Sequence, residues 1–395
     1  DGPISLEIFN DQFRGGSPKS IAKDGYRSLV ALMDDVRRAA PAPVPSLPDL
    51  PARIEAKGVA FIEFATRGAE AEALATQLTA LGFARSGTHR TKQLDLWQQG
   101  DIRIVLNRET EGHAAHVWNA QGTAVCDIGL QVNSAQDAIT RAEGLGSNPF
   151  KQPLGPGQLD IPAIRGLSGS VLHFLDEVSG LDKVWEVEFE VHSRSAGAGL
   201  THVDHIAQTM SYEDMLSWSL FFTTLLDVRK SPMVDVIDPD GLVRSQALST
   251  PDGRVRITLN GAETHRTLAG SFLAESFGAS VQHVALATDD IFETASALTT
   301  HGFLALPIPS NYYADLAARF NIEPTLLERM SACNILYDND GRGEFFQLYS
   351  RPFAGGMFFE IVQRRGDYSG FGAPNAPFRT AAQKRLMRPK GMPRA

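Results

Sequence analysis

The sequence predicts an α+β protein built from four copies of one βαβββ module, arranged as two tandem domains of two modules each. Four strand-like segments share a four-residue pattern that starts with valine and ends with an apolar residue. The third residue of the pattern differs between the copies, and we call it the variable position. The four segments begin at Val59, Val125, Val203 and Val281. Each is followed by a stretch with helical periodicity, and these stretches end at similar distances, at Gly82, Gly146, Asp227 and Gly302. Glycine is favoured just after a helix, so the recurrence of both features indicates an internal repeat.

Further strand-like runs complete each module. Examples are Leu94–Gln98, Ile102–Leu106, Asn334–Tyr337 and Glu344–Tyr349. We therefore expect a first domain over residues 52–192, ending in a strand at Val184–Val191, and a second over residues 199–386. A helix at Phe378–Leu386 is expected to close the cavity of the second domain.

The N-terminal segment differs from the repeat. Ile4–Phe9 is predicted to be a short buried strand and Ser17–Ala40 a helix. A proline-rich linker over residues 41–51 follows, which marks a domain boundary. Because one strand and one helix cannot bury a core alone, we expect residues 1–40 to be the end of a further domain, with the chain a fragment of a longer protein.

Composition excludes several classes of protein. The chain has 395 residues, is 43% hydrophobic and carries a formal net charge of −9, which argues against nucleic-acid binding. It contains no apolar run long enough to span a membrane. The two cysteines, Cys126 and Cys333, are interpreted as reduced thiols. We expect a cytoplasmic protein, and a homo-oligomer as the default assembly.

A metal site is predicted from the variable position of the repeat. That position is His205 in the third module and His283 in the fourth. Glu360 lies in an otherwise apolar strand, where a carboxylate is costly to bury unless it is paired or bound to a metal. Two histidines and one carboxylate on one face leave coordination positions open, as in non-haem Fe(II) oxygenases.

The first domain is predicted to bind no metal at the corresponding place, because its variable positions are Phe61 and Asp127. A single histidine in a strand is more often a structural residue than a ligand. The remaining histidines of this half are accordingly interpreted as surface or structural residues: His89, His113, His116 and His173. His202 is expected to face away from His205, since an odd offset along a strand reverses the side-chain direction.

The second domain resembles the catalytic domain of 4-hydroxyphenylpyruvate dioxygenase, a member of the vicinal oxygen chelate superfamily. The similar motifs are Val203–Ile206, Gly278–Leu286, Asn311–Tyr313, Ile335–Gly341, Phe345–Tyr349, Phe358–Arg364 and Gly370–Gly372. The resemblance implies a vicinal oxygen chelate fold with one divalent metal on His205, His283 and Glu360. Fe(II) is the metal it implies, with Mg²⁺ or Mn²⁺ kept open. It also implies an aromatic or oxo-acid substrate and oxygen.

Substrate contacts follow from the same resemblance. The positions that match the family's pocket are Gln282, Gln347, Ser245, Asn260 and Phe371. Three other pocket positions depart from the family pattern: Leu268, Ala376 and Tyr349. The metal ligands are thus kept while the pocket differs, which puts 4-hydroxyphenylpyruvate itself in doubt as the substrate.

The segment Ser5–Arg14 resembles the last strand and loop of a xylose-isomerase-like TIM barrel, in which Glu7 would be a metal ligand. A barrel followed by a dioxygenase-like domain is the layout of bacterial fused 3-dehydroshikimate dehydratases. Most of that barrel is expected to be missing here, and Glu7 is then an orphan surface carboxylate. Two hypotheses follow. The chain is either an Fe(II) dioxygenase for an aromatic 2-oxo acid or related small acid, or a non-catalytic metal-binding module of a dehydratase.

Overall fold

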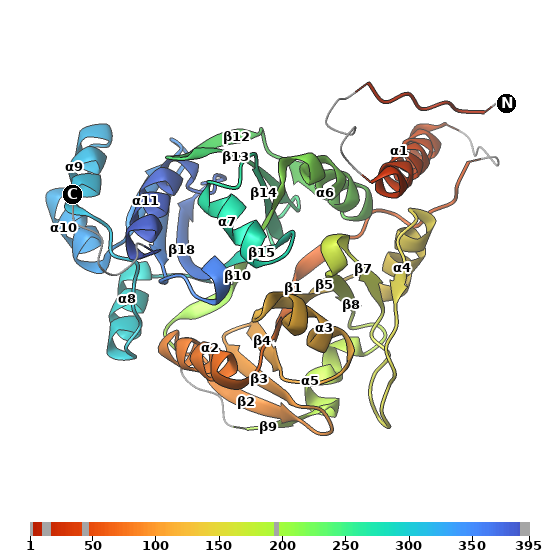
Figure 1. The fold of residues 1–395 in the computed structure, drawn as a ribbon, viewed down its shortest axis with the longest axis horizontal. Helices are drawn as coiled ribbons and strands as arrows, with labels where there is room; N and C mark the ends of the chain where they lie inside the picture. The colour runs from red at the N-terminus through yellow and green to blue at the C-terminus, as the bar shows by residue number, and fades with distance from the viewer. Residues whose placement is uncertain (1–2, 10–16, 42–46, 193–196, 388–395) are drawn as a thin grey trace.

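The protein is described by a computed structural model that covers residues 3–9, 17–41, 47–192 and 197–387. Two curled sheets of nine strands each lie side by side, with helices packed against them (Figure 1). The predicted α+β class is confirmed.

The first sheet has the strand order β6-β7-β8-β5-β1-β4-β3-β2-β9. Its strands are β1 (Ala56–Ala65), β2 (Ala84–His89), β3 (Leu94–Gln99), β4 (Ile102–Asn107), β5 (Ala124–Val132), β6 (Pro149–Phe150), β7 (Ala163–Arg165), β8 (Val171–Leu175) and β9 (Phe189–Val191). The helices of this domain are α2 (Gly68–Ala80), α3 (Gly112–Gln121), α4 (Ala135–Gly144) and α5 (Val184–Val187).

The second sheet has the order β11-β13-β14-β10-β15-β18-β17-β16, with β12 paired to β13. Its strands are β10 (Leu200–Ser211), β11 (Arg229–Lys230), β12 (Val234–Asp238), β13 (Gly241–Ser249), β14 (Arg256–Ala262), β15 (Ser280–Thr288), β16 (Leu336–Asn339), β17 (Gly343–Tyr349) and β18 (Phe358–Gly366). The helices are α6 (Tyr212–Leu225), α7 (Leu268–Glu275), α8 (Ile291–Thr300), α9 (Ser310–Arg319), α10 (Pro324–Cys333) and α11 (Ala376–Met387).

Both sheets follow the predicted repeat. The first strands of the two modules pair antiparallel at the centre of each sheet, β1 with β5 and β10 with β15. Each of these strands also pairs in parallel with the last strand of its own module. Helices α2, α4 and α8 end just before glycines with positive φ, at Gly82, Gly146 and Gly302, as the sequence predicted.

Three register shifts interrupt the central antiparallel pair of each domain, and two of them are β-bulges next to the candidate ligands. In the second domain Asp204 is the extra residue of β10 and Gln282 that of β15. In the first domain Ala60 and Cys126 occupy the same two places. A bulge bends the strand and re-aims its side chains, so Gln282 and its neighbour His283 can both face one cavity.

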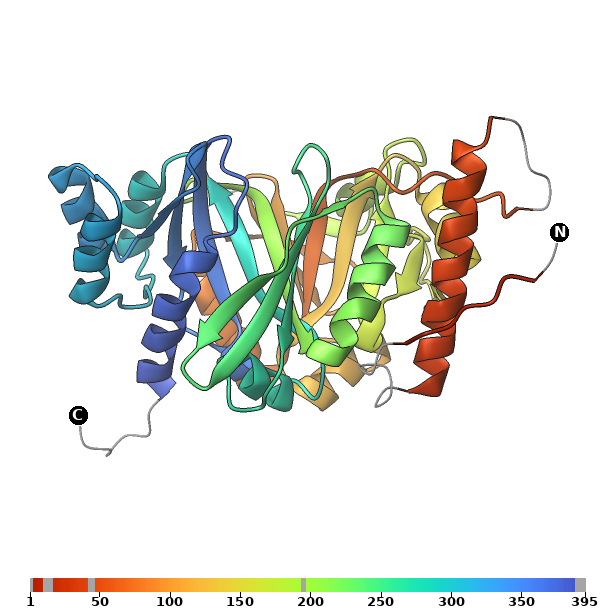
Figure 2. The same ribbon diagram turned by 90° about the horizontal axis from the view of Figure 1, so that it is seen from above.

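Helix α1 (Pro18–Ala39) packs along α6 at the end of the molecule opposite α9 and α10 (Figure 2). The buried Arg141 of α4 donates to Asp34 of α1 at 2.9 Å and to the backbone carbonyl of Thr224 in α6. These bonds join α1 to both domains. Residues 42–46 of the expected linker and Asn10–Arg14 of the barrel-like motif lie outside the described residues.

Two predicted strands are wrong. Ile4–Phe9 is exposed and forms no strand, because no described strand lies beside it to share a hydrogen-bonding ladder. Val184–Val191 splits into the helix α5 and the short strand β9. The helical turn places Trp185 edge-on to Phe61 at 5.7 Å between ring centroids, so tertiary packing overrides the alternating pattern.

Among the described residues, no helix combines the length and the apolar character that crossing a bilayer requires.

Candidate metal centre

Three side chains converge inside the second sheet. His205 lies on β10, His283 on β15 and Glu360 on β18, and these three strands are consecutive neighbours in the sheet. The His205 Nε2 atom lies 3.2 Å from His283 Nε2 and 3.4 Å from Glu360 Oε2, and the last two atoms are 3.3 Å apart. Within the described part of the chain, this is the one group of its kind that could hold a metal ion.

The spacing of the donor atoms fits a divalent ion. Nitrogen and oxygen ligands lie about 2.1 Å from such an ion, so two ligands that meet at a right angle are separated by about 3.0 Å. Tetrahedral ligands are separated by about 3.4 Å. Two imidazole nitrogens and a carboxylate oxygen facing one another at these distances favour a cation between them, and all three residues come from one concave face, which leaves the opposite side open.

The ring of His205 is held from behind by Asp204. Its Nδ1 atom lies 2.7 Å from Asp204 Oδ1, so a neutral His205 carries its proton there and turns the Nε2 lone pair to the site. Burial alone would raise the pKa of Asp204, but Arg364 outweighs this effect and holds that pKa well below its usual range. Arg364 donates two hydrogen bonds to Asp204, of 2.8 and 2.9 Å. Arg256 donates one more to Asp204, of 3.2 Å.

The electrostatics of the two histidines differ. Burial lowers the pKa of His283, as do the neighbouring His205 and Arg379, so His283 is neutral and in the form that binds metals. For His205, burial lowers the pKa, but hydrogen bonds to Asp204 and Glu360 outweigh burial and raise it. The carboxylates thus favour positive charge beside His205, which either a proton or a metal ion can provide.

Glu360 is fixed by a chain of buried side-chain bonds. Gln347 donates to Glu360 Oε1 at 2.8 Å, and Asn375 donates to Gln347 Oε1 at the same distance. The Nε2 atom of Gln347 also lies 2.6 Å from the hydroxyl oxygen of Tyr349. This arrangement leaves Oε2 of Glu360 directed at the two histidines.

A cavity of about 90 Å³ adjoins the three predicted ligands. Of the five predicted substrate contacts, Ser245, Asn260, Gln282 and Phe371 line this cavity. Gln347 does not line it, since it lies behind Glu360. Leu268, Ala376 and Tyr349, which depart from the family pattern, also lie at the cavity wall.

The residues of the cavity wall are held in place by different contacts. Ser245 and Asn260 are directly paired on β13 and β14. Gln282 accepts a hydrogen bond of 2.9 Å from Thr209 through Oε1, which leaves its amide nitrogen for the cavity. The ring of Phe371 meets His205 edge-on at 5.6 Å between centroids. His202 lies outside this cavity, as predicted.

Helix α11 closes the cavity from the C-terminal side. Its residues Ala376, Arg379 and Thr380 line the wall, and the Arg379 guanidinium lies 5.0 Å from the centroid of the Phe358 ring. Lys384, further along α11, bonds to Asp238 at the end of β12 at 2.5 Å. The helix is therefore fastened across the opening by an ion pair.

Sequence reasoning missed several residues of this site. Asp204 and Arg364 each lie in a motif of the family resemblance, but they are 160 positions apart, so the sequence gives no sign that they pair. Arg379 gave no signal beyond its place on an expected helix. A conspicuous clue was available for Asp204, because a carboxylate inside an apolar strand needs a partner.

Comparisons with known proteins agree with this architecture. The family of N-terminal domains of hydroxyphenylpyruvate dioxygenases matches residues 51–190. A 3-dehydroshikimate dehydratase of Pseudomonas aeruginosa is 38% identical over 394 residues, covering 98% of this chain and 62% of its own length. A 4-hydroxyphenylpyruvate dioxygenase of the same species is 31% identical over 325 residues, covering 80% of this chain and 90% of its own length.

A solved structure of a xylose isomerase-like TIM barrel/4-hydroxyphenylpyruvate dioxygenase fusion protein is similar throughout. It has a TM-score of 0.86 and 36% sequence identity, over 98% of this chain and 62% of that chain. The chain therefore spans about three fifths of the length of the dehydratase and of the fusion protein.

The tandem βαβββ modules and the converging His–His–Glu group define a protein of the vicinal oxygen chelate class. Within this class, the chain belongs to the 4-hydroxyphenylpyruvate dioxygenase family, a family of metal-dependent enzymes that use small-molecule substrates and oxygen.

Proposed function

We propose that the second domain is a non-haem Fe(II) dioxygenase centre that acts on an aromatic 2-oxo acid or a related small acid. The observation that carries this proposal is the convergence of His205, His283 and Glu360 to within 3.4 Å of one another. Two neutral imidazoles and one carboxylate give a bound divalent ion a net positive charge, which favours an anionic substrate. Mg²⁺ and Mn²⁺ can bind the same donor atoms, but these ions prefer oxygen ligands to imidazole nitrogens.

The chain's own residues would have distinct tasks. His205, His283 and Glu360 would hold the metal, which supplies oxygen activation when Fe(II) is bound. Asp204 would fix the tautomer of His205, and Gln347 would orient Glu360.

The cavity wall offers donors to an acid. The amides of Gln282 and Asn260 and the hydroxyl of Ser245 would orient its oxygens, while Phe371 excludes water from the side of His205. Arg379 adds a positive charge at the wall, so it would attract a carboxylate group.

The volume of the cavity constrains how a substrate enters. About 90 Å³ is well below the ~300–1,000 Å³ that is usual for small-molecule sites. A ring-bearing acid thus requires helix α11 to move outward, and such a movement breaks the ion pairs of Lys384 with Asp238 and Asp240. Closure of α11 over the substrate would then exclude bulk water.

Anaerobic titration tests this proposal. The protein is loaded with Fe(II) and titrated with phenylpyruvate and 4-hydroxyphenylpyruvate, and visible absorption is recorded for the charge-transfer band of a chelated 2-oxo acid. The band should form and should be lost in His283→Ala. The matched control is His301→Ala, because His301 is an exposed residue at the end of α8, outside the site. Iron binding without a band from either acid would reject the 2-oxo acid as substrate.

A second candidate function is favoured by the similarity along the whole chain. The match to the dehydratase extends over 98% of this chain, α1 included, whereas the match to the dioxygenase extends over 80%. In this alternative the domain is a metal-binding module that supports a dehydratase barrel in cis, and α1 joins that barrel to both domains through Arg141.

Oxygen consumption separates the two functions. A dioxygenase should consume oxygen in proportion to the acid supplied, when loaded with Fe(II). A supporting module should bind metal and consume none, and loss of the metal should instead lower the thermal stability of the protein that contains it.

A further inference from the structure

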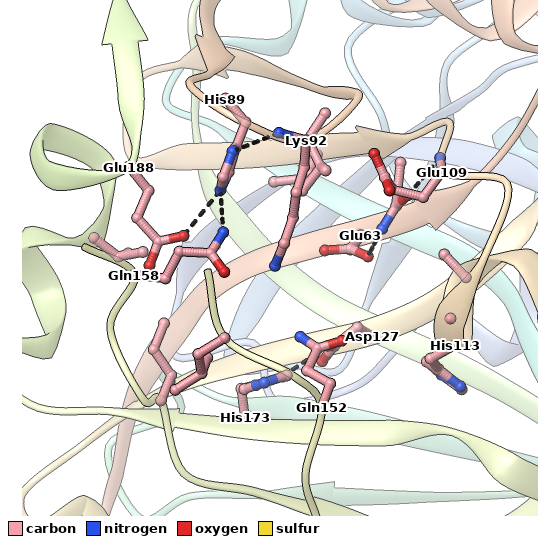
Figure 3. Close-up of a pocket in the computed structure, with 18 of the residues that line it drawn as sticks. Glu63, His89, Lys92, Glu109, His113, Asp127, Gln152, Gln158, His173 and Glu188 are labelled. Carbon is pink, nitrogen blue, oxygen red and sulfur yellow. Dashed lines mark hydrogen bonds and ion pairs between the residues drawn. The ribbon is translucent and has the colours of Figure 1, made fainter. Parts of the chain in front are cut away.

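The first domain contains a cavity of about 340 Å³, which is larger than the one beside the candidate metal centre (Figure 3). This volume lies at the lower end of the range of about 300–1,000 Å³ for small-molecule sites, so it suits a ligand with a single ring. Neither the candidate metal centre nor the proposed dioxygenase function uses this cavity.

The cavity occupies the place that the metal centre occupies in the second domain. The strand registers make Phe61 the counterpart of His205, Asp127 that of His283 and His173 that of Glu360. All three residues line the cavity of the first domain. The first domain therefore has a cavity at the place of the metal centre, lined by different side chains.

The changed side chains exclude a metal bound as in the second domain. The ring of Phe61 replaces an imidazole and lies 6.0 Å from the ring of His173, between centroids. Gly129 leaves room for this ring, since a Cβ atom there would meet Phe61 at 2.2 Å. Phe61 offers no donor atom to a metal, so the absence of a metal from this part of the first domain stays a prediction.

His173 and Asp127 form a buried pair at the floor of the cavity, with 2.7 Å between Nδ1 and Oδ2. Burial lowers the pKa of His173, but Asp127 outweighs burial and raises it, so the imidazole carries a positive charge more readily than usual. The other oxygen of Asp127, Oδ1, is buried and has no hydrogen-bond partner among the described residues. A buried unpartnered carboxylate oxygen is costly unless a ligand donates to it.

Lys92 is positioned by a second buried pair. His89 binds Glu188 at 2.9 Å through Nε2. Its Nδ1 atom accepts hydrogen bonds of 3.1 Å from the backbone N–H groups of Thr91 and Lys92. His89 was interpreted as a surface or structural residue, and the structure shows that it is buried and holds the loop that carries Lys92.

The side chain of Lys92 points into the middle of the cavity, above His173 and Asp127 (Figure 3). Within the described residues, its ammonium group forms no ion pair. Asp127 is paired with His173, whereas Glu188 accepts a hydrogen bond from His89, which is neutral because its Nδ1 atom accepts two backbone hydrogen bonds. A cation that forms no ion pair and is directed into a cavity favours an anionic ligand.

The remaining wall residues suit a ring with hydroxyl groups. Phe61, Phe150 and Trp185 provide aromatic surfaces. Glu63 accepts a hydrogen bond of 2.8 Å from Asn107, the counterpart of Asn260, and its carboxyl group also faces the cavity (Figure 3).

We propose that this cavity binds a monocyclic carboxylic acid that carries hydroxyl groups. The carboxylate of the ligand pairs with Lys92 and His173. Its hydroxyl groups donate to Asp127 Oδ1 and to Glu63, and its ring lies against the aromatic wall. This site takes its ligand without a metal and is separate from the centre formed by His205, His283 and Glu360.

Protein NMR tests the proposal with 3,4-dihydroxybenzoate as the probe. The chain has four tryptophans, and the indole N–H signal of Trp185 is identified with the Trp185→Phe variant. Saturable movement of this signal should report binding at the cavity of the first domain. The neutral match, 3,4-dihydroxybenzamide, should bind at least tenfold more weakly, because it lacks the charge that pairs with Lys92.

Variants of the full chain complete the test. Lys92→Met should weaken binding of the acid at least tenfold, while Lys92→Arg should retain most of it. Lys230→Met, at an exposed position on β11, and His283→Ala, in the candidate metal centre, should leave it unchanged. The proposal is overturned if the signal does not move at about 10 mM probe, well above the dissociation constant of a millimolar site. It is equally overturned if the amide binds as well as the acid, or if His283→Ala abolishes the movement.

Discussion

Asp204→Asn tests whether the metal centre depends on the charged residues behind it. The substitution keeps the shape of the side chain but removes a charge that binds His205 at 2.7 Å, Arg364 at 2.8 and 2.9 Å and Arg256 at 3.2 Å. The amide group of the asparagine also places an N–H donor where the N–H donors of Arg364 and Arg256 need an acceptor. Removing one partner of a buried ion pair costs about 3–5 kcal/mol, and loss of a carboxylate behind a metal-binding histidine weakens metal affinity about 10- to 100-fold.

The assays are urea unfolding of the metal-free protein and anaerobic Fe(II) titration. The matched control is Asp315→Asn, since Asp315 is half-exposed and pairs with Arg319 on the surface of α9. A surface change of this kind is expected to alter stability by about 0.5 kcal/mol or less. If Asp204→Asn matches the control in both assays, the charged residues behind His205 do not support the site, and this reasoning fails.

Three further outcomes are expected. Lys384→Met should release α11 from Asp238, so that the backbone amides of α11 exchange with deuterium faster than in the wild-type protein, while those of β18 do not. If the amides of α11 exchange at the same rate in both proteins, Lys384 does not hold α11 in place. Arg141→Met should destabilise the fold by about 1.5–3 kcal/mol in urea unfolding, because the buried Asp34 loses its partner in α4 but keeps its hydrogen bond with Arg38; a change below about 1 kcal/mol would contradict this. Glu63→Gln should change how stability depends on pH: burial, and then Asp127, raise the pKa of Glu63 to about 7, so the wild-type protein should lose on the order of 1 kcal/mol per pH unit between about 4.5 and 7 relative to the variant.

The sign of the Glu63 effect follows from its raised pKa. Its contribution to stability is fully present below the pKa of the unfolded chain and is lost as the pH rises through the pKa of the folded state. The groups that face Glu63 are Asp127, His173, Asn107 and the thiol of Cys126. Urea unfolding of both proteins at several pH values measures the effect, and parallel curves would contradict it.

The repeat could be predicted from sequence because its period is carried by local features. Strand patterns and the glycines after the helices recur in each copy, and a strand with one ionisable residue among apolar ones draws attention to Glu360. The placement of His205 and His283 then follows from the equivalence of the two modules. These features fix the fold class and the candidate ligands without any knowledge of distant contacts.

Other features depend on contacts between residues that are far apart in the chain. The pairing of His89 with Glu188 joins residues 99 positions apart, and neither residue belongs to a motif. The bulges at Asp204 and Gln282 arise from strand pairing, which sequence periodicity does not show. Trp185 lies in a helical turn, although its neighbours alternate as in a strand, because burial against Phe61 determines its conformation.

The stoichiometry of Fe(II) binding tests the central claim most directly. Equilibrium dialysis under anaerobic conditions should give one Fe(II) per chain for the wild-type protein and none for Glu360→Ala. His173→Ala, at the corresponding position of the first domain, should still bind one. Two ions per chain, or one ion that is retained in Glu360→Ala and lost in His173→Ala, would contradict the assignment of the metal to His205, His283 and Glu360.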